Sequence, residues 1–193
     1  MFTLGALPEL ILGSALLAAY AVALILVLTS RRHPAAAPLL AAAILIALAL
    51  LAVAISPILP AFPFAAALAV LGAALAALGG DPAARSVLTF ASRGLVREGP
   101  NGGILLRTPA MTTAQAPEVM RGGVTIGYLE RAAAALAIIV GYPEAIAVVV
   151  AIKGIARFTE LGSPETRERF IIGTLASLGW ACVVAATVRL ALG

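Results

Sequence analysis

The chain has 193 residues, of which 62% are hydrophobic and only 11% are charged. Soluble domains are roughly 45–50% apolar and about 25% charged, so this sequence lacks the polar residues that would coat a soluble protein of its size. The composition therefore predicts a membrane protein, and the length leaves room for one helical bundle without a second soluble domain.

The first apolar run covers residues 8–28 and ends at Arg31-Arg32-His33-Pro34. A signal peptide carries its basic residues before the apolar stretch, so the reversed order here predicts a retained helix. Five further apolar runs follow, at residues 39–59, 61–78, 124–140, 144–161 and 169–192. Each is close to the roughly 20 residues that cross a hydrocarbon core of ~30 Å, and none alternates like a barrel strand. We predict an all-α, polytopic bundle of about six transmembrane helices.

The basic residues predict the orientation of this bundle. They lie in the connections after the first, third and fifth runs, whereas the connections after the second and fourth carry none. The residues concerned are Arg31, Arg32, Arg85, Arg93, Arg97, Arg107, Arg121, Arg167 and Arg169. By the positive-inside rule these connections are cytoplasmic and both termini lie outside. The net charge of +4 is thus explained by orientation and by contact with anionic lipids, and we expect no nucleic-acid partner.

The longest connection divides the chain into segments 1–80, 81–123 and 124–193. Gly79-Gly80 is expected to end the third helix, and Asp81-Pro82 resembles the start of a new one. The pattern that follows predicts a short amphipathic helix on the cytoplasmic membrane surface, then an irregular loop. This segment is expected to tether two three-helix halves, with a gate or a docking surface as the alternative role.

Five charged residues fall within the fourth and fifth predicted helices: Glu130, Arg131, Lys153, Arg157 and Glu160. An ionised side chain near the bilayer centre costs at least roughly 2.5–3.5 kcal/mol, so such residues pair or line a wet cavity. The turn between the two helices is centred near Tyr142, which sets Lys153 at a depth similar to that of Glu130. We predict an ion pair between them, and a second between Arg157 and either Glu160 or a residue of the last helix.

These charges sum to +1, and Arg169 adds to them at the start of the last helix. A positive site in the cytoplasmic leaflet suits an anion, most naturally a lipid phosphate. In the hypothesis that follows, Lys153 and Arg157 contact the anion and Glu130 balances Lys153 when the site is empty. Arg131 or Arg169 guides the anion from the cytoplasm. The protein would then be a small transporter, channel or lipid-binding protein.

Two other interpretations stay open. The charges can simply lock helices together, with Arg131 and Arg157 reaching toward the headgroups, in a non-enzymatic membrane subunit or assembly factor. The third alternative is an enzyme that acts on a lipid-linked substrate, with Glu130 or Glu160 as its general base. Anionic membrane lipids are the expected partners, and a homo-oligomer or a membrane-protein partner fits either non-enzymatic interpretation.

Three segments of the second half carry a resemblance: Gly127–Arg131, Lys153–Leu161 and Glu168–Ser177. Together they resemble a group of multi-spanning bacterial membrane proteins of uncharacterised function, over about residues 122–180. The Gly79-Gly80-Asp81-Pro82 junction looks similar too, whereas the first three helices match only in hydropathy. The resemblance implies a multi-pass protein of the bacterial plasma membrane and implies no reaction.

The sequence gives little support to cofactor chemistry or to catalysis. His33 and Cys182 are the sole residues of their types and lie far apart, so we predict no metal site and no haem. Asp81 is the sole aspartate, which excludes the multi-aspartate magnesium motif of membrane phosphotransferases. Ser177 has no histidine partner for a serine-hydrolase mechanism. Cys182 lies in an apolar run, where it reads as a small packing residue.

Overall fold

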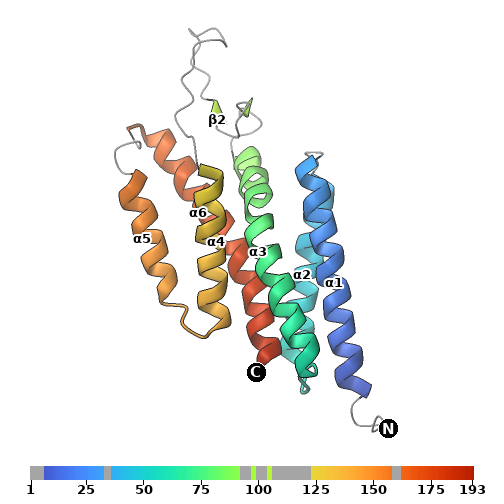
Figure 1. Cartoon of the computed structure of the whole chain (residues 1–193). Coiled ribbons are helices and arrows are strands. Elements are labelled where there is room, and N and C mark those ends of the chain that lie inside the picture. The colour runs from blue at the N-terminus through green and yellow to red at the C-terminus, as the bar shows by residue number, and fades with distance from the viewer. Residues whose placement is uncertain (1–6, 33–35, 92–96, 99–103, 106–122, 158–161) are drawn as a thin grey trace.

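The computed structural model describes residues 7–32, 36–91, 97–98, 104–105, 123–157 and 162–193. They form six helices: α1 (Leu7–Arg32), α2 (Ala36–Ile55), α3 (Phe62–Ala91), α4 (Gly123–Ile139), α5 (Ala145–Arg157) and α6 (Pro164–Leu192). Two short strands, β1 (Arg97–Glu98) and β2 (Ile104–Leu105), pair in antiparallel fashion. The predicted all-α bundle is confirmed (Figure 1).

The helices run up and down in chain order. The C-terminal ends of α1, α3 and α5 lie at one end of the bundle, and the start of α1 and the end of α6 lie at the other (Figure 1). The orientation predicted from the basic residues depends on this up-and-down order of the helices. Which end faces the cytoplasm stays a prediction.

Four helices are long and apolar enough to cross a membrane: α1, α2, α3 and α6. This makes the chain a membrane protein, as its composition predicts. The described parts of α4 and α5 are shorter, with 17 and 13 residues. Residues 158–161, which the sequence assigned to the end of the fifth helix, lie outside the described residues.

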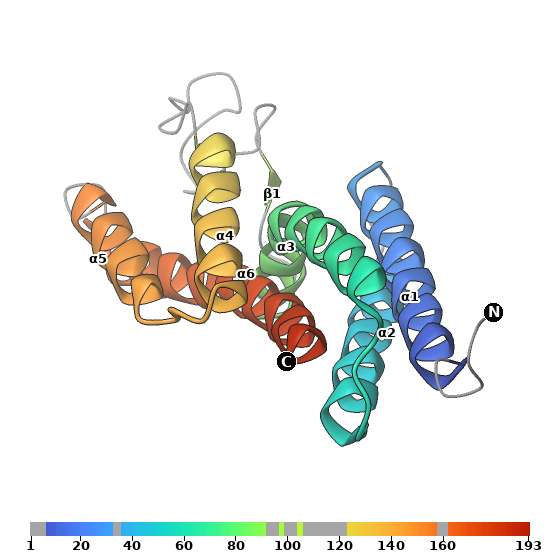
Figure 2. The ribbon, with the colours of Figure 1, turned by 60° about the horizontal axis from the view of Figure 1, so that its bottom comes forward.

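The centre of the bundle is the contact between α3 and α6, with α1 and α2 on one side and α4 and α5 on the other (Figure 2). Small residues allow this close approach. A Cβ added at Gly72 of α3 would lie 2.5 Å from Cγ2 of Val188 on α6. Nearby, the fully buried Tyr20 of α1 donates a hydrogen bond of 3.0 Å to the carbonyl oxygen of Val184. One tyrosine therefore ties α1 to the centre without leaving its hydroxyl unsatisfied.

Helix α3 does not end at Gly79-Gly80, and this part of the prediction is wrong. The helix continues through Pro82 to Ala91, so the expected helix start at Asp81 and the segment boundary at residue 80 both fall inside it. We call Gly79 and Gly80 the glycine notch, because the absence of side chains at these positions lets α6 pack closely against α3. A Cβ at Gly79 would lie 2.2 Å from Nε1 of Trp180, and one at Gly80 would lie 2.8 Å from the Ser177 carbonyl oxygen. Glycine is present here because α6 approaches the α3 backbone, not because the helix stops.

Candidate functional site

Three side chains from one turn of α4 contact four neighbouring helices. Glu130 faces α5, Arg131 faces α3 and α6, and Tyr128 meets Arg31 of α1. Consecutive helix residues point about 100° apart, so Glu130 and Arg131 serve different contacts. The polar residues predicted to form one cluster therefore fall into two.

The first cluster is the ion pair between α4 and α5. Lys153 Nζ donates a hydrogen bond to Oε2 of Glu130, which confirms the predicted pairing. The two side chains are only partly exposed, 20% for Lys153 and 11% for Glu130. Because opposite charges neutralise each other here, the pair lowers the cost of placing either residue in the apolar span.

Helix α5 is attached to the bundle through α4. Within the described part of the chain, α5 contacts no other helix and has no buried residue. Several of its large apolar side chains are exposed, and Ile155 is 78% exposed. The ion pair of Lys153 with Glu130 is thus a specific polar link on a peripheral helix.

Arg131 is oriented differently from the prediction. It is 4% exposed, and its hydrogen bonds go to α3 and α6 and not toward Lys153. Its Nε donates a 2.6 Å hydrogen bond to the Ala77 carbonyl oxygen, and its Nη1 donates a 3.0 Å bond to Oγ of Ser177. A Cβ at Gly80 would lie 2.2 Å from Cδ of Arg131, so the glycine notch also makes room for this side chain. Arg131 joins α4 to α3 and α6.

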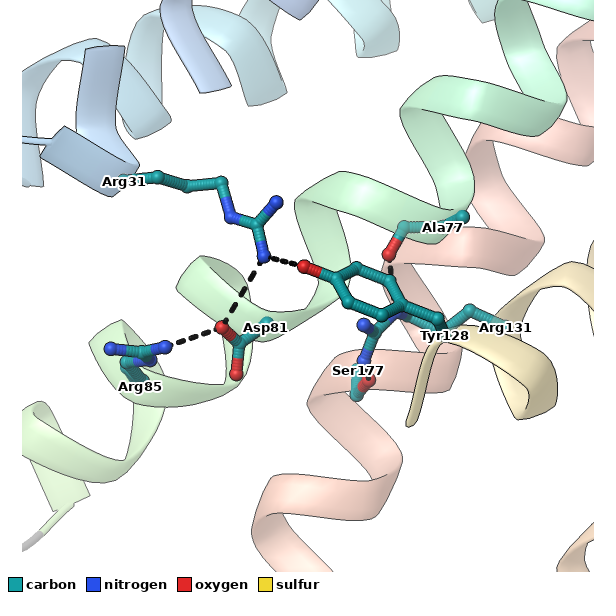
Figure 3. A network of polar contacts seen from close by, with 7 residues as sticks. All are labelled: Arg31, Ala77, Asp81, Arg85, Tyr128, Arg131 and Ser177. Atoms are coloured by element: carbon teal, nitrogen blue, oxygen red, sulfur yellow. Dashed lines mark hydrogen bonds and ion pairs between the residues drawn. The ribbon is translucent and has the colours of Figure 1, made fainter. Parts of the chain in front are cut away.

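The second cluster, which we call the arginine layer, comprises Arg31, Asp81, Arg85, Tyr128 and Arg131 (Figure 3). Arg85 Nη2 donates to Oδ2 of Asp81 at 2.5 Å, and Arg31 Nη2 lies 3.9 Å from the same oxygen. Arg31 also donates to the Tyr128 hydroxyl. Two guanidinium groups therefore lie at one carboxylate and Arg131 adds a third to the layer, so its five residues carry a surplus of positive charge.

Tyr128 lies between two of these arginines. The guanidinium carbons of Arg31 and Arg131 are 5.3 and 5.1 Å from the centroid of its ring. A cation within about 6 Å of a ring face is attracted to it. Tyr128 thus stabilises two like charges close to each other and connects α1 to α4.

The depth of the arginine layer follows from α3. From Phe62 to Asp81 the helix rises about 29 Å at 1.5 Å per residue, close to the ~30 Å of a hydrocarbon core. Arg31 lies in the last turn of α1, where that apolar helix also ends. The layer therefore sits at one edge of the apolar slab, at the depth of lipid headgroups.

The remaining predicted site residues are spread along the same end of the bundle. Arg157 is the last residue of α5, and its Nη2 lies 3.3 Å from the position of a Cβ added at Gly123, the first residue of α4. Arg169 lies half-buried near the start of α6, and Glu160 lies outside the described residues. Among the described residues, no group of three or more His, Cys, Asp and Glu side chains could hold a metal ion.

Sequence reasoning missed the roles of Arg31 and Tyr128. Their contact joins helices that are far apart in the chain, so no spacing rule could reveal it. Two local signals were present. Asp81 and Arg85 are four residues apart, and Tyr128 and Arg131 are three apart, so each pair shares one helix face. Both signals now prove to belong to the same layer.

No family model matches the chain, and neither a curated protein nor a solved structure matches it.

Proposed function

We propose that this membrane protein is a multi-pass protein of the bacterial plasma membrane that binds an anionic group at Lys153, as a small transporter, channel or lipid-binding protein. The observation that carries the proposal is the attachment of α5. Within the described chain, α5 has no buried residue and packs on α4 alone. Across this interface, Lys153 of α5 donates a hydrogen bond to Glu130 of α4. A lipid phosphate is the anion that best suits this position.

The chemistry is an exchange of partners. A lysine in an apolar span requires a counter-charge, and Glu130 supplies it in the structure described. A phosphate oxygen offers the same negative charge and more acceptor sites, so it can replace the carboxylate on Nζ. Arg157 follows Lys153 by four residues on the same face of α5 and would provide the second cation.

The location is proposed on two grounds. The resemblance of residues 122–180 to bacterial multi-spanning proteins supports a bacterial plasma membrane. The gathering of Arg31, Arg32 and Arg85 at one end of the bundle supports a cytoplasmic position for that end. The anion would then be received from the cytoplasmic leaflet, which is rich in anionic lipid.

The test is reconstitution of the full chain into vesicles of neutral and anionic lipid. Translocation of a fluorescent phosphatidylglycerol and uptake of inorganic phosphate are measured for the wild type, for Lys153→Met and for Ile152→Met. Ile152 is an exposed neighbour on α5, so its replacement controls for a methionine on this helix. We expect Lys153→Met to abolish activity and Ile152→Met to retain it. Equal activity in wild type and Lys153→Met would contradict the proposal.

A second function rests on the same contacts. Glu130 and Lys153 cancel each other's charge, and Arg131 donates to groups of α3 and α6, so each of these charges also joins helices. This favours a non-enzymatic membrane subunit or assembly factor whose charges are structural. Purification from native membranes separates the two functions, because a stoichiometric protein partner that is retained by Lys153→Met favours the subunit.

A further inference from the structure

The arginine layer contains an arrangement that the α4–α5 hairpin does not explain. Arg31 of α1 and Arg85 of α3 share one carboxylate oxygen of Asp81. All three side chains retain contact with the outside: 25% of Arg31, 45% of Arg85 and 24% of Asp81 is exposed. The Asp81 carboxylate is therefore an oxyanion, supplied by the protein itself, that lies between two accessible guanidinium groups.

We propose that Arg31 and Arg85 form a binding site for a phosphate oxyanion, that of an anionic lipid headgroup, and that Asp81 occupies this site when no lipid is bound. This site is distinct from the proposed anion site at Lys153, because Arg31, Asp81 and Arg85 lie on α1 and α3 and not on α4 or α5. The two proposals therefore stand or fall separately.

Charge supports a phosphate at this position. Arg31, Arg85 and Arg131 carry three positive charges against the single negative charge of Asp81. A bound phosphate would bring the layer closer to neutrality. Guanidinium groups bind phosphate through paired N–H donors, and they do so better than the compact charge of lysine.

Position supports a lipid as the source of the phosphate. The layer lies at the edge of the apolar slab, where α1 ends and where α3 has already spanned the thickness of a hydrocarbon core. Lipid phosphates lie at this depth. Tyr128, whose hydroxyl accepts from Arg31, is typical of residues at this interface.

Tyr128 and Arg131 hold Arg31 in place. The Tyr128 ring lies against both guanidinium groups, and Arg131 is itself fixed by hydrogen bonds to α3 and α6. Tyr128 therefore positions Arg31 with Nη2 at 3.9 Å from the Asp81 oxygen. An incoming phosphate would displace the Asp81 carboxylate from Arg31, while the contacts of Tyr128 and Arg131 are retained.

The test uses the full chain in a neutral detergent, titrated by calorimetry with a short-chain phosphatidylglycerol. Short-chain phosphatidylcholine and inorganic phosphate are titrated separately, so a lipid source is distinguished from free phosphate. Arg31→Gln should raise the Kd for phosphatidylglycerol about tenfold. Asp81→Asn should lower it about tenfold, because it removes the competing carboxylate and keeps the side-chain shape. Arg189→Gln is the matched control, since Arg189 lies at the opposite end of α6 and donates to the Gly193 carbonyl.

Asp81→Asn keeps the test decisive even if Arg31→Gln fails to fold, because the predicted effect is a gain. Tighter phosphatidylglycerol binding by Asp81→Asn, with Arg189→Gln unchanged, supports the proposal. Binding of inorganic phosphate in place of lipid, with the same order among the variants, supports the oxyanion site but assigns it to free phosphate. Unchanged or weaker binding by a folded Asp81→Asn overturns the proposal.

Discussion

Gly80→Ala tests whether the contact between α3 and α6 depends on the glycine notch. The added methyl group would lie 2.2 Å from Cδ of Arg131 and 2.8 Å from the Ser177 carbonyl oxygen, where ordinary contacts begin near 3.4 Å. Arg131 can shift, but the carbonyl belongs to the α6 backbone, so the helices must separate. Overpacking costs about 1–3 kcal/mol. Because there are two clashes, we expect an overpacking cost at the upper end of this range, about 3 kcal/mol. Alanine has a better helix propensity than glycine by about 1 kcal/mol, so the expected net loss of stability is about 2 kcal/mol.

The measurement is reversible unfolding of the purified protein in mixed micelles with increasing SDS. Gly154→Ala is the matched control, because a Cβ at Gly154 of α5 meets nothing within 4 Å. It should leave stability unchanged or raise it by up to about 1 kcal/mol. If Gly80→Ala unfolds at the same SDS fraction as Gly154→Ala, the reasoning about the notch is refuted.

Three further substitutions test individual contacts by the same unfolding assay. Arg131→Met should lower the free energy of unfolding by about 1–3 kcal/mol, because it removes the hydrogen bonds to the Ser177 hydroxyl and the Ala77 carbonyl oxygen. Unchanged stability would contradict the inference that Arg131 joins α4 to α3 and α6. Tyr20→Phe should cost about 1 kcal/mol, since it removes one buried hydrogen bond and keeps the ring; a loss above 3 kcal/mol would mean that the ring packing had changed as well. Glu130→Gln should cost about 1–3 kcal/mol because it leaves Lys153 without its counter-charge, and adding Lys153→Met should recover part of that loss. Additive losses in this pair would argue against a direct ion pair.

The fold was predictable from the sequence wherever hydropathy or the geometry of one hairpin decided it. Apolar length alone located α1, α2 and α6. The antiparallel register around the turn near Tyr142 placed Lys153 opposite Glu130, and the structure confirms this pair. Such rules succeed because they depend on residues that are close in the chain.

The prediction failed where distant segments decide the structure. Gly79-Gly80 looks like a helix end until Trp180 and the Ser177 backbone are placed against it. Arg131 was grouped with Lys153 by depth, but it lies about 100° around α4 from Glu130 and is taken up by α3 and α6. In both cases the deciding partner is on α6, about 50 to 100 residues further along the chain, where no spacing pattern could indicate it.

The central claim, that Lys153 receives an anion, is tested most directly by native mass spectrometry of the gently solubilised protein, wild type beside Lys153→Met. We predict that the wild type retains a bound anionic lipid or phosphate species that a folded Lys153→Met lacks, beyond any lipid at the Arg31 and Arg85 site, which both proteins keep. Arg189→Gln, which removes a positive charge at the other end of α6, should retain it. The same number of bound anionic species in all three proteins, or none in the wild type, would contradict the account.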